Sequence, residues 1–440
     1  MGNRPRTLLI AEAANPEWVS VPLVGWSLAQ ALRGVADVHL VTQVRNRAAI
    51  GRAGLVEGVD FTAIDSEAFA RPMHRLAGVL SFGRGKGWTM RTALAALAYP
   101  YFEHLVWRRF GAGIAAGAYD IVHRITPLSP TVNSPLAARC RRAGVPFVLG
   151  PLNGGVPWPP GFETERLRER EFLSYLRGLN RYRPGRWRTL SAASAILAGS
   201  RHVEQEIPAR LQGRTIYLPE NAIDPARFDL EAPLAPPPPG GPPLRACFIG
   251  RMVPYKGPDM LLEAAAPLIR DGRMTLQMIG DGPMLADLRA QAAALGLDEP
   301  GLRFHGWTPH AEIAGRVRDC NLMAFPSIRE FGGGVVLEAM ALGLVPLIVD
   351  YAGPGELVDD AVGIKVPIGP RAGIVAGFRA ELERLAADPG VLEPMRHAGR
   401  ARVKAQFTWA RKAEQVARVY DWVLARGAVP KPDLLADLAG

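Results

Sequence analysis

The chain has 440 residues, more than one hydrophobic core usually supports, so we expect two domains. Hydrophobic residues make up 48%, charged residues 21%, and the mean hydropathy is +0.04, which excludes a disordered chain, a disulfide scaffold and a polytopic membrane protein. The net charge is +10. Residues 1–225 hold 28 Lys and Arg against 17 Asp and Glu (+11), and residues 226–440 hold 24 against 25 (−1). This asymmetry indicates a polyanionic or membrane-surface partner for the first half only.

Several other classes of protein are excluded by spacing. The three cysteines are far apart in the sequence and form no pair or cluster at metal-binding or disulfide spacing; they are Cys140, Cys247 and Cys320. The apolar stretch Thr7–Ala11 is too short for a signal peptide. The longest candidate for a membrane span, Thr92–Phe110, is interrupted by proline and charged residues. We therefore expect a reducing compartment, no bound metal and no membrane-spanning segment.

Short apolar runs rich in β-branched residues alternate with amphipathic helical stretches in both halves. This alternation is typical of parallel sheets covered by helices, and it predicts an α/β fold with one Rossmann-like unit in each half. The first half is expected to contain the strands Thr7–Ala13, Asp37–Val44, Asp120–Ile125, Pro146–Gly150, Ala195–Ala198 and Thr215–Leu218. The second half is expected to contain Leu244–Gly250, Thr275–Gly280, Leu302–Gly306, Asn321–Phe325, Val345–Asp350 and Gly363–Val366.

Two further features complete the organisation of the chain. The segment Ala232–Pro243 consists largely of proline and glycine, which cannot join a sheet, so it is predicted to be a linker or surface loop. The chain ends with two amphipathic stretches, Val391–Gln406 and Trp409–Arg426, which are predicted to be helices.

A glycine-rich segment in the second half has the pattern of an anion-binding turn. It follows the predicted strand Asn321–Phe325, passes through Gly332–Gly334 and enters a helix. The first turn of such a helix presents unpaired backbone N–H groups and the positive end of the helix dipole, which together bind phosphate. Glu330 precedes the turn and Glu338 lies two helical turns further on. Carboxylates accept hydrogen bonds from vicinal hydroxyls, so this pattern favours a sugar and a ribose on either side of a diphosphate.

A second segment supplies cations for such a ligand. Arg251 and Lys256 follow the predicted strand Leu244–Gly250 and precede a helix that begins near Gly257. Open α/β sheets bind ligands at the carboxyl ends of their strands, so both cations are predicted to lie at the binding edge.

These motifs together resemble the retaining glycosyltransferases of family four, which have the GT-B architecture. The resemblance is carried by the Glu, seven residues, Glu spacing of Glu330 and Glu338, by Gly250–Arg251 and by Lys256–Gly257. It extends over about Leu218–Tyr420 through further family elements: Asn221–Asp224, Ile279–Pro283, Phe304–Gly306, Gly353–Val358 and Thr408–Trp409.

The resemblance implies two Rossmann-like domains that face each other across a cleft, with a C-terminal helix returning to the first domain. It implies an N-terminal acceptor-binding domain over residues 1–220 and a nucleotide-sugar-binding domain over residues 221–405. Residues 406–440 are then the returning helix and a tail.

The resemblance also implies roles for individual residues. Arg251 and Lys256 would hold the diphosphate, Glu330 with the backbone of Phe331–Gly333 would bind sugar hydroxyls, and Glu338 would bind the ribose. Arg251, Lys256 and Glu330 would be catalytic residues, and the two cations would stabilise the negative charge that develops on the leaving diphosphate. The implied donor site also includes residues at three strand ends and in the glycine-rich turn: Gly250, Gly282, Gly306, Gly332 and Gly333.

The first half matches the family less closely. His123 stands where many members have the first histidine of a His-x-His pair, but Ile125 occupies the second place. His123 is therefore either a catalytic residue or a packed histidine at the end of a strand. The residues Asn153, Gly154 and Gly155 follow a predicted strand and are expected to contact the acceptor or the transferred sugar.

The first half also contains basic, aromatic stretches. Phe82–Phe110 and Arg166–Arg188 are read either as solvated helix faces with core aromatics or as an interface with anionic lipid. Gly83–Trp88 lacks the Gly-Lys-Ser/Thr ending of a phosphate loop and is predicted to be a flexible turn.

The sequence thus favours a hexosyltransferase that moves a sugar from a UDP- or GDP-linked donor to an acceptor hydroxyl. The acceptor is expected to be a lipid-linked saccharide for a cell-surface polysaccharide or glycolipid, handled in the cytoplasm at the inner face of the cell membrane. No cofactor, metal or nucleic acid is expected. Two alternatives stay open, a sugar-nucleotide epimerase or phosphorylase on the same architecture, and a non-enzymatic basic protein that binds a membrane surface.

Overall fold

The computed structural model describes residues 4–67, 88–163, 184–234 and 243–435. The chain divides into two compact units. The first unit comprises residues 1–155, 171–220 and 409–440, and the second comprises residues 156–170 and 221–408. The chain therefore passes between the units several times, and its C-terminal part belongs to the first.

The described residues of the first unit form a seven-stranded parallel sheet in the order β3-β2-β1-β4-β5-β6-β7. Every residue of the central strands β4 and β5 is buried, which explains why β5 reads as a continuous apolar run, whereas β4 also buries the polar side chains of His123 and Arg124. The strands are β1 (Arg6–Ala11), β2 (Asp37–Gln43), β3 (Phe61–Ile64), β4 (Ile121–Thr126), β5 (Phe147–Leu152), β6 (Ala195–Ala198) and β7 (Thr215–Tyr217).

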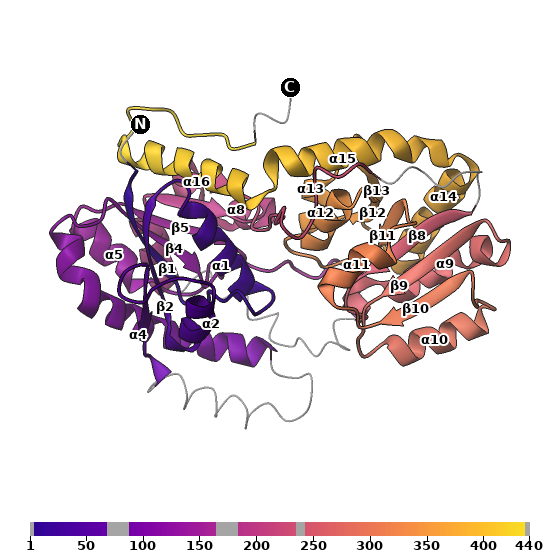
Figure 1. Cartoon of the computed structure of the whole chain (residues 1–440), viewed down its shortest axis with the longest axis horizontal. Coiled ribbons are helices and arrows are strands. Elements are labelled where there is room, and N and C mark those ends of the chain that lie inside the picture. The colour runs from indigo at the N-terminus through magenta and orange to yellow at the C-terminus, as the bar shows by residue number, and fades with distance from the viewer. Residues whose placement is uncertain (1–3, 68–87, 164–183, 235–242, 436–440) are drawn as a thin grey trace. The chain divides into compact units, whose positions relative to one another are not determined.

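Helices cover this sheet, and the C-terminal helix α16 is one of them. Helix α16 packs beside α1, and its Val416 and Tyr420 are fully buried in the core that the sheet forms with α1 (Figure 1). The prediction that the last helix returns to the first domain is confirmed. The helices are α1 (Val21–Leu32), α2 (Arg47–Arg52), α4 (Trp88–Ala115), α5 (Pro135–Arg142), α7 (Pro184–Ala192), α8 (Arg201–Glu206) and α16 (Trp409–Leu424).

In the second unit, the residues that the structure describes form a six-stranded parallel sheet in the order β10-β9-β8-β11-β12-β13. Its strands are β8 (Leu244–Ile249), β9 (Met274–Ile279), β10 (Leu302–Gly306), β11 (Leu322–Phe325), β12 (Val345–Asp350) and β13 (Ile364–Pro367). Its helices are α9 (Pro258–Arg270), α10 (Leu285–Ala294), α11 (His310–Arg316), α12 (Gly334–Ala341), α13 (Ala352–Leu357), α14 (Arg371–Ala387) and α15 (Leu392–Gln406), and the short 3-10 helix η4 covers Pro254–Lys256.

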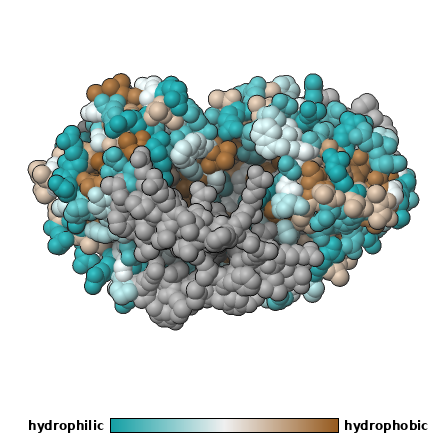
Figure 2. All heavy atoms as spheres, turned by 90° about the horizontal axis from the view of Figure 1, so that it is seen from below, coloured by the Kyte–Doolittle hydropathy of each residue, from teal (hydrophilic) through white to brown (hydrophobic). Residues whose placement is uncertain are grey.

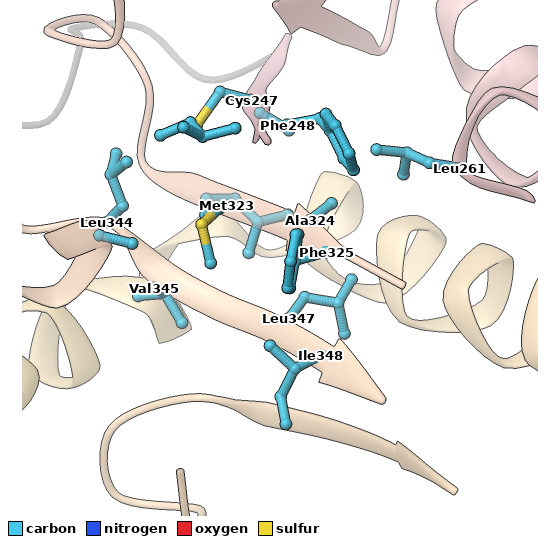
Figure 3. Packing of buried hydrophobic residues seen from close by; sticks show 14 of the residues in the cluster. Cys247, Phe248, Leu261, Met323, Ala324, Phe325, Leu344, Val345, Leu347 and Ile348 are labelled. Carbon is cyan, nitrogen blue, oxygen red and sulfur yellow. The ribbon is translucent and has the colours of Figure 1, made fainter. Parts of the chain in front are cut away.

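The core of the second unit is centred on β11, which pairs with β8 on one side and β12 on the other. Phe248 of β8 and Phe325 of β11 are both fully buried, with ring centroids 5.8 Å apart, and Leu261 of α9 packs in the same cluster (Figure 3). Dense packing here fixes the ends of β8 and β11, where the candidate site begins.

On the molecular face in Figure 2, hydrophilic residues predominate and apolar residues form small groups among them.

The predicted strands and the two C-terminal helices are all present, with ends that differ by at most two residues. Sequence analysis missed β3, because a four-residue strand is too short to show a clear pattern. No helix of the described residues is long and apolar enough to span a membrane, and the candidate Thr92–Phe110 falls inside α4.

The structure assigns one segment differently from the predicted ranges. Residues 156–163 belong to the second unit, although the predicted N-terminal domain ran continuously over residues 1–220. The physical reason is that Phe162 is 1% exposed in the core of the second unit and Trp158 packs against that core. The second unit also extends to Thr408, where Thr408 pairs with Ile223.

Some predictions concern residues outside the described ranges. These are the turn Gly83–Trp88 except for Trp88, most of Arg166–Arg188, the start of Phe82–Phe110 and most of the linker Ala232–Pro243.

Candidate active site

The candidate site lies at the carboxyl ends of β8 and β11 in the second unit. These strands are neighbours, and the chain runs from β8 toward one edge of the sheet and from β11 toward the other. A reversal of this kind is where open α/β sheets bind ligands. The loops that follow the two strands are joined, because Tyr255 accepts hydrogen bonds through its carbonyl from the N–H of Ile328 (2.9 Å) and the hydroxyl of Ser327 (3.2 Å). The two predicted motifs therefore form one structure.

Lys256 and Glu330 are in direct contact at this edge. The Lys256 ammonium donates a hydrogen bond to Glu330 Oε2 and forms an ion pair with it. The side chains are 14% and 21% exposed, so the pair is screened from solvent only in part. Lys256 Nζ also lies 4.9 Å from the centroid of the Phe325 ring, which places the cation over the buried end of β11. Tertiary structure thus joins a cation and a carboxylate that are 74 positions apart in the chain.

Arg251, in contrast, is exposed, and among the residues that the structure describes no hydrogen bond or ion pair of its side chain occurs. It follows Gly250 at the end of β8, in the same loop as Lys256. Its guanidinium, which carries five N–H donors, is available to an anion at this edge of the sheet.

Glycines allow the neighbouring loops to touch. A Cβ on Gly280, at the end of β9, would lie 2.0 Å from the carbonyl oxygen of Gly250. A Cβ on Gly282 would lie 2.4 Å from the carbonyl oxygen of Met252. The predicted donor residue Gly282 therefore lets the turn after β9 pack against the loop after β8. Gly306 ends β10 with φ +69° and has open space on its Cβ side.

The glycine-rich turn after β11 leads into α12 as predicted. Gly333 caps the helix in the left-handed conformation (φ 58°) that glycine adopts without strain. The backbone of Phe331 lies so close to α13 that a Cβ on Gly353 would be 1.9 Å from its carbonyl oxygen, and the Gly353 N–H donates to the Glu330 carbonyl (3.2 Å). The turn Phe331–Gly333 is thus held in place beside the first, unpaired N–H groups of α12.

Glu338 lies on α12 and pairs with a histidine that sequence analysis did not single out. His310 donates from Nε2 to Glu338 Oε1 at 3.0 Å, and the two side chains are 36% and 31% exposed. Phe228 packs edge-on against the His310 ring, at 5.6 Å between centroids. The only signal in the sequence was that His310 follows the end of β10 by a few residues, which did not distinguish it from its neighbours.

The structure places His123 in the interior of the first unit. The side chain is fully buried in β4, and both ring nitrogens are hydrogen-bonded inside the first unit. Nε2 lies 2.7 Å from the carbonyl oxygen of Gly150, and Nδ1 lies 2.7 Å from the hydroxyl of Tyr420. Burial lowers the pKa of His123 to about 4. His123 is therefore a packed, neutral histidine in this structure.

The predicted acceptor residues follow β5 in the first unit. Asn153 donates through its amide to both carboxylate oxygens of Glu220, at 2.9 and 2.8 Å, and accepts at Oδ1 from the Gly155 N–H at 3.0 Å. Gly154 packs against Val203 and Pro130, where a Cβ would meet their side chains at 3.2 and 3.3 Å. Asn153 is therefore occupied in holding this loop. Within the described ranges, no group of three or more His, Cys, Asp or Glu side chains is placed to hold a metal ion.

Comparisons with known proteins agree with this geometry. The family model described as "Glycosyl transferases group 1" matches residues 237–400. The D-inositol 3-phosphate glycosyltransferase of Gordonia bronchialis is 32% identical over 209 residues, which cover 44% of this chain and 43% of the relative. The corresponding enzyme of Frankia alni is 29% identical over 73% of this chain and 78% of the relative. The 2-deoxystreptamine glucosyltransferase of Streptomyces kanamyceticus is 29% identical over 48% of this chain and 56% of the relative.

Solved structures with the same fold cover nearly the whole chain. Anabaena HepE in complex with UDP and glucose aligns with a TM-score of 0.55 and 15% identity over 95% of this chain and 100% of that one. The lipopolysaccharide outer core galactosyltransferase WaaB in its apo form aligns with a TM-score of 0.59 and 15% identity over 96% and 99%. At these identities the likeness shows the fold alone.

Two Rossmann-like units, with the last helix in the first of them, define the fold as GT-B. Residues 237–400 match the group 1 glycosyltransferases, and this match together with the curated relatives supports the resemblance to family four of that architecture. The matches to the first curated relatives span about two fifths to little more than half of those proteins.

Proposed function

We propose that this chain is a retaining glycosyltransferase that moves a sugar from a UDP- or GDP-linked donor to an acceptor hydroxyl. The observation that carries the proposal is the contact of Lys256 with Glu330 beside the first turn of α12. One edge of the sheet thus offers a cation, a carboxylate and unpaired backbone N–H groups, which suit a diphosphate joined to a sugar.

The diphosphate is bound by positive charge from two sources. Arg251 and Lys256 supply side-chain cations, and the first turn of α12 supplies N–H groups and the positive end of the helix dipole. As the bond from the sugar to the phosphate breaks, negative charge grows on the diphosphate. Because the donors are already in place, they stabilise that charge without reorganisation, which lowers the barrier.

The two carboxylates bind hydroxyl groups on either side of the diphosphate. Lys256 has three N–H donors, so it can bind a phosphate oxygen while it keeps its bond to Glu330. Glu330 then accepts hydrogen bonds from the sugar. Glu338, held by His310, accepts hydrogen bonds from the ribose. Each carboxylate is therefore held by a hydrogen-bond partner before the donor binds, Glu330 by Lys256 and Glu338 by His310.

The acceptor hydroxyl loses its proton to the leaving phosphate in this proposal. Attack on the face from which the diphosphate leaves gives retention of configuration. The described part of the first unit holds His123 buried and fully bonded, so no step is assigned to it. Proton NMR of the product, formed from a panel of nucleotide-sugars, tests retention through the coupling constant of the new anomeric proton. An inverted product would contradict the mechanism.

The acceptor is proposed to be a lipid-linked saccharide presented at an anionic membrane surface. The support is the charge of +11 over residues 1–225, against −1 over residues 226–440. Sedimentation with vesicles tests this part separately. Salt-sensitive binding to vesicles with anionic lipid, but not to neutral vesicles, is expected, and equal binding to both would contradict it.

Calorimetry tests the donor site. UDP or GDP should bind the wild-type chain, and Lys256→Ala should weaken binding about tenfold to a hundredfold, because a charge-assisted hydrogen bond contributes about 1.5–3 kcal/mol. Lys404→Ala is the matched control, since Lys404 also pairs with a carboxylate of the second unit, that of Glu231, but on α15. If neither nucleotide binds, or if both variants bind like the wild type, the donor site is refuted.

A further inference from the structure

Residues 156–163 come from the first half of the sequence but pack on the second unit. Phe162 is buried in its core and Trp158 packs on the surface of that core. The preceding residue in the chain, Gly155, belongs to the first unit, where Asn153 is bonded to Glu220. The hydrogen bonds of Val156 and Pro157 and the ring contacts of Trp158 described below fall on loops that follow strands of the second sheet.

Trp158 contacts the sequence neighbours of both members of the Lys256–Glu330 pair. Its ring lies 6.4 Å from the ring of Tyr255, edge to face at 88°, and Tyr255 directly precedes Lys256. The guanidinium carbon of Arg329 lies 5.0 Å from the centroid of the Trp158 ring, and Arg329 directly precedes Glu330. One indole therefore touches the backbone neighbours of the proposed phosphate-binding cation and of the proposed sugar-binding carboxylate.

Hydrogen bonds fix the backbone of the segment against the same loops. Arg329 donates from Nε to the carbonyl oxygen of Val156 at 3.1 Å. Tyr351, which follows β12, donates from its hydroxyl to the carbonyl oxygen of Pro157 at 3.1 Å. The segment is therefore attached to the loops after β11 and β12 by hydrogen bonds and to the loop after β8 through the two aromatic rings. Because residues 156–158 are attached at several contacts, this segment resists rotation about any single contact.

We propose that Trp158 and Arg329 are positioning residues of the donor site, which hold Lys256 and Glu330 at the separation that a diphosphate-linked sugar requires. This inference rests on the proposed function. Neither residue needs to touch the ligand. Trp158 restricts Tyr255 and hence the loop that carries Lys256, while Arg329 is clamped between the Trp158 ring and the Val156 carbonyl and so orients Glu330. The base and ribose of the donor bind elsewhere on this edge of the sheet, so Trp158 and Arg329 do not affect their binding.

The test compares a nucleoside diphosphate with its nucleoside. For whichever of UDP and GDP the wild type binds, Trp158→Leu should raise the Kd about tenfold, as expected when a cation is displaced from a phosphate. The Kd of the matching nucleoside, uridine or guanosine, should change by less than about twofold. Trp158→Phe, which retains an aromatic face for Arg329, should recover most of the diphosphate affinity. A purely structural role would weaken both ligands alike.

A matched control is present in the first unit, where the Arg210 guanidinium stacks on Trp187 at 3.5 Å. Trp187→Leu removes a cation–aromatic stack of the same kind and should leave both Kd values unchanged. Arg329→Lys provides a second route, because it keeps the charge but loses the planar stack and the Nε bond to Val156. It should lower the diphosphate affinity like Trp158→Leu, and it gives the answer if the tryptophan variant does not fold.

The outcomes separate the two proposals. Unchanged diphosphate affinity in folded Trp158→Leu or Arg329→Lys, or equal losses for diphosphate and nucleoside, would overturn the positioning role while the donor site stands. A wild-type chain that binds no nucleoside diphosphate would overturn the proposed function, and this inference with it.

Discussion

Tyr420 and His123 are separated by 297 positions in the chain, yet the Tyr420 hydroxyl lies 2.7 Å from Nδ1 of His123. The other ring nitrogen, Nε2, faces the Gly150 carbonyl, which can only accept a hydrogen bond. The neutral imidazole therefore carries its proton on Nε2 and accepts at Nδ1 from the tyrosine. This arrangement ties the C-terminal helix to the central strands of the first sheet through a neutral, buried histidine.

Stability at acid pH should depend on His123. Burial lowers the pKa of His123 to about 4 in the folded chain, below the usual 6.5 of an exposed histidine. Between these two values the unfolded chain binds a proton that the folded chain does not, so the free energy of unfolding falls as the pH is lowered. The contribution reaches about 3 kcal/mol near pH 4.

His123→Gln is the variant that isolates this effect. Glutamine can donate to the Gly150 carbonyl and accept from Tyr420, but it does not titrate. Urea unfolding of both proteins between about pH 7 and pH 4 should show the wild type losing more stability than the variant. Parallel stability curves would refute the assignment of this pH dependence to His123.

Lys412 of α16 should give a second pH dependence, on the alkaline side. It is 1% exposed and donates to the Pro219 carbonyl, and burial lowers the pKa of Lys412 to about 7, against a smaller opposing effect of Glu220. Between about pH 7 and about pH 10.5, Lys412 is protonated in the unfolded chain but neutral in the folded chain. The folded state therefore becomes more stable, relative to Lys412→Met, as the pH rises from 7 toward 10.5, by up to about 5 kcal/mol. Urea unfolding of both proteins as a function of pH measures the difference, and a constant difference would contradict the prediction.

Substitution of Gly353 should disturb the glycine-rich turn from outside it. In Gly353→Ala the new Cβ would lie 1.9 Å from the Phe331 carbonyl oxygen, a backbone atom, so the turn must shift. We expect a loss of about 1–3 kcal/mol in stability, typical of overpacking, together with weaker nucleotide binding. Thermal unfolding and calorimetry measure both. Gly369→Ala is the control, because no atom lies within 4 Å of its added Cβ. Equal behaviour of the two variants would show that the turn tolerates the displacement.

Recognition of the ribose should depend on Glu338. The wild type is expected to bind UDP or GDP about tenfold or more tightly than the 2′,3′-dideoxy analogue, because a carboxylate that loses its hydroxyl partners forfeits charge-assisted bonds. In Glu338→Gln this discrimination should shrink to a few-fold, and His310→Ala should reduce it by a smaller factor, since His310 only orients the carboxylate.

The control for this comparison is Glu312→Gln. Glu312 is a half-exposed carboxylate of α11 that pairs with Arg316 on the same helix. It should leave the discrimination intact. If Glu338→Gln retains the full preference for the ribonucleotide, the ribose is bound by other groups.

Local patterns in the sequence determined much of this fold. A buried parallel strand such as β5 is apolar along its length, so it can be recognised without knowledge of its partners. The glycine-rich turn and the cations after β8 were also predictable, because the conformation of a turn depends on its own residues. Sequence analysis missed strand β3 because four residues are too few to show a clear hydrophobic pattern.

The tertiary structure decided which side chains meet. Nothing near His123 in the chain indicates that Gly150 and Tyr420 occupy both of its nitrogens, and nothing near Trp158 indicates that it packs on Tyr255 and Arg329. Burial and backbone conformation follow from residues close in sequence, whereas a hydrogen-bond partner is selected by packing between distant elements. The sequence by itself therefore determined the architecture and the kind of site, and packing decided which of the predicted residues are free to bind a ligand.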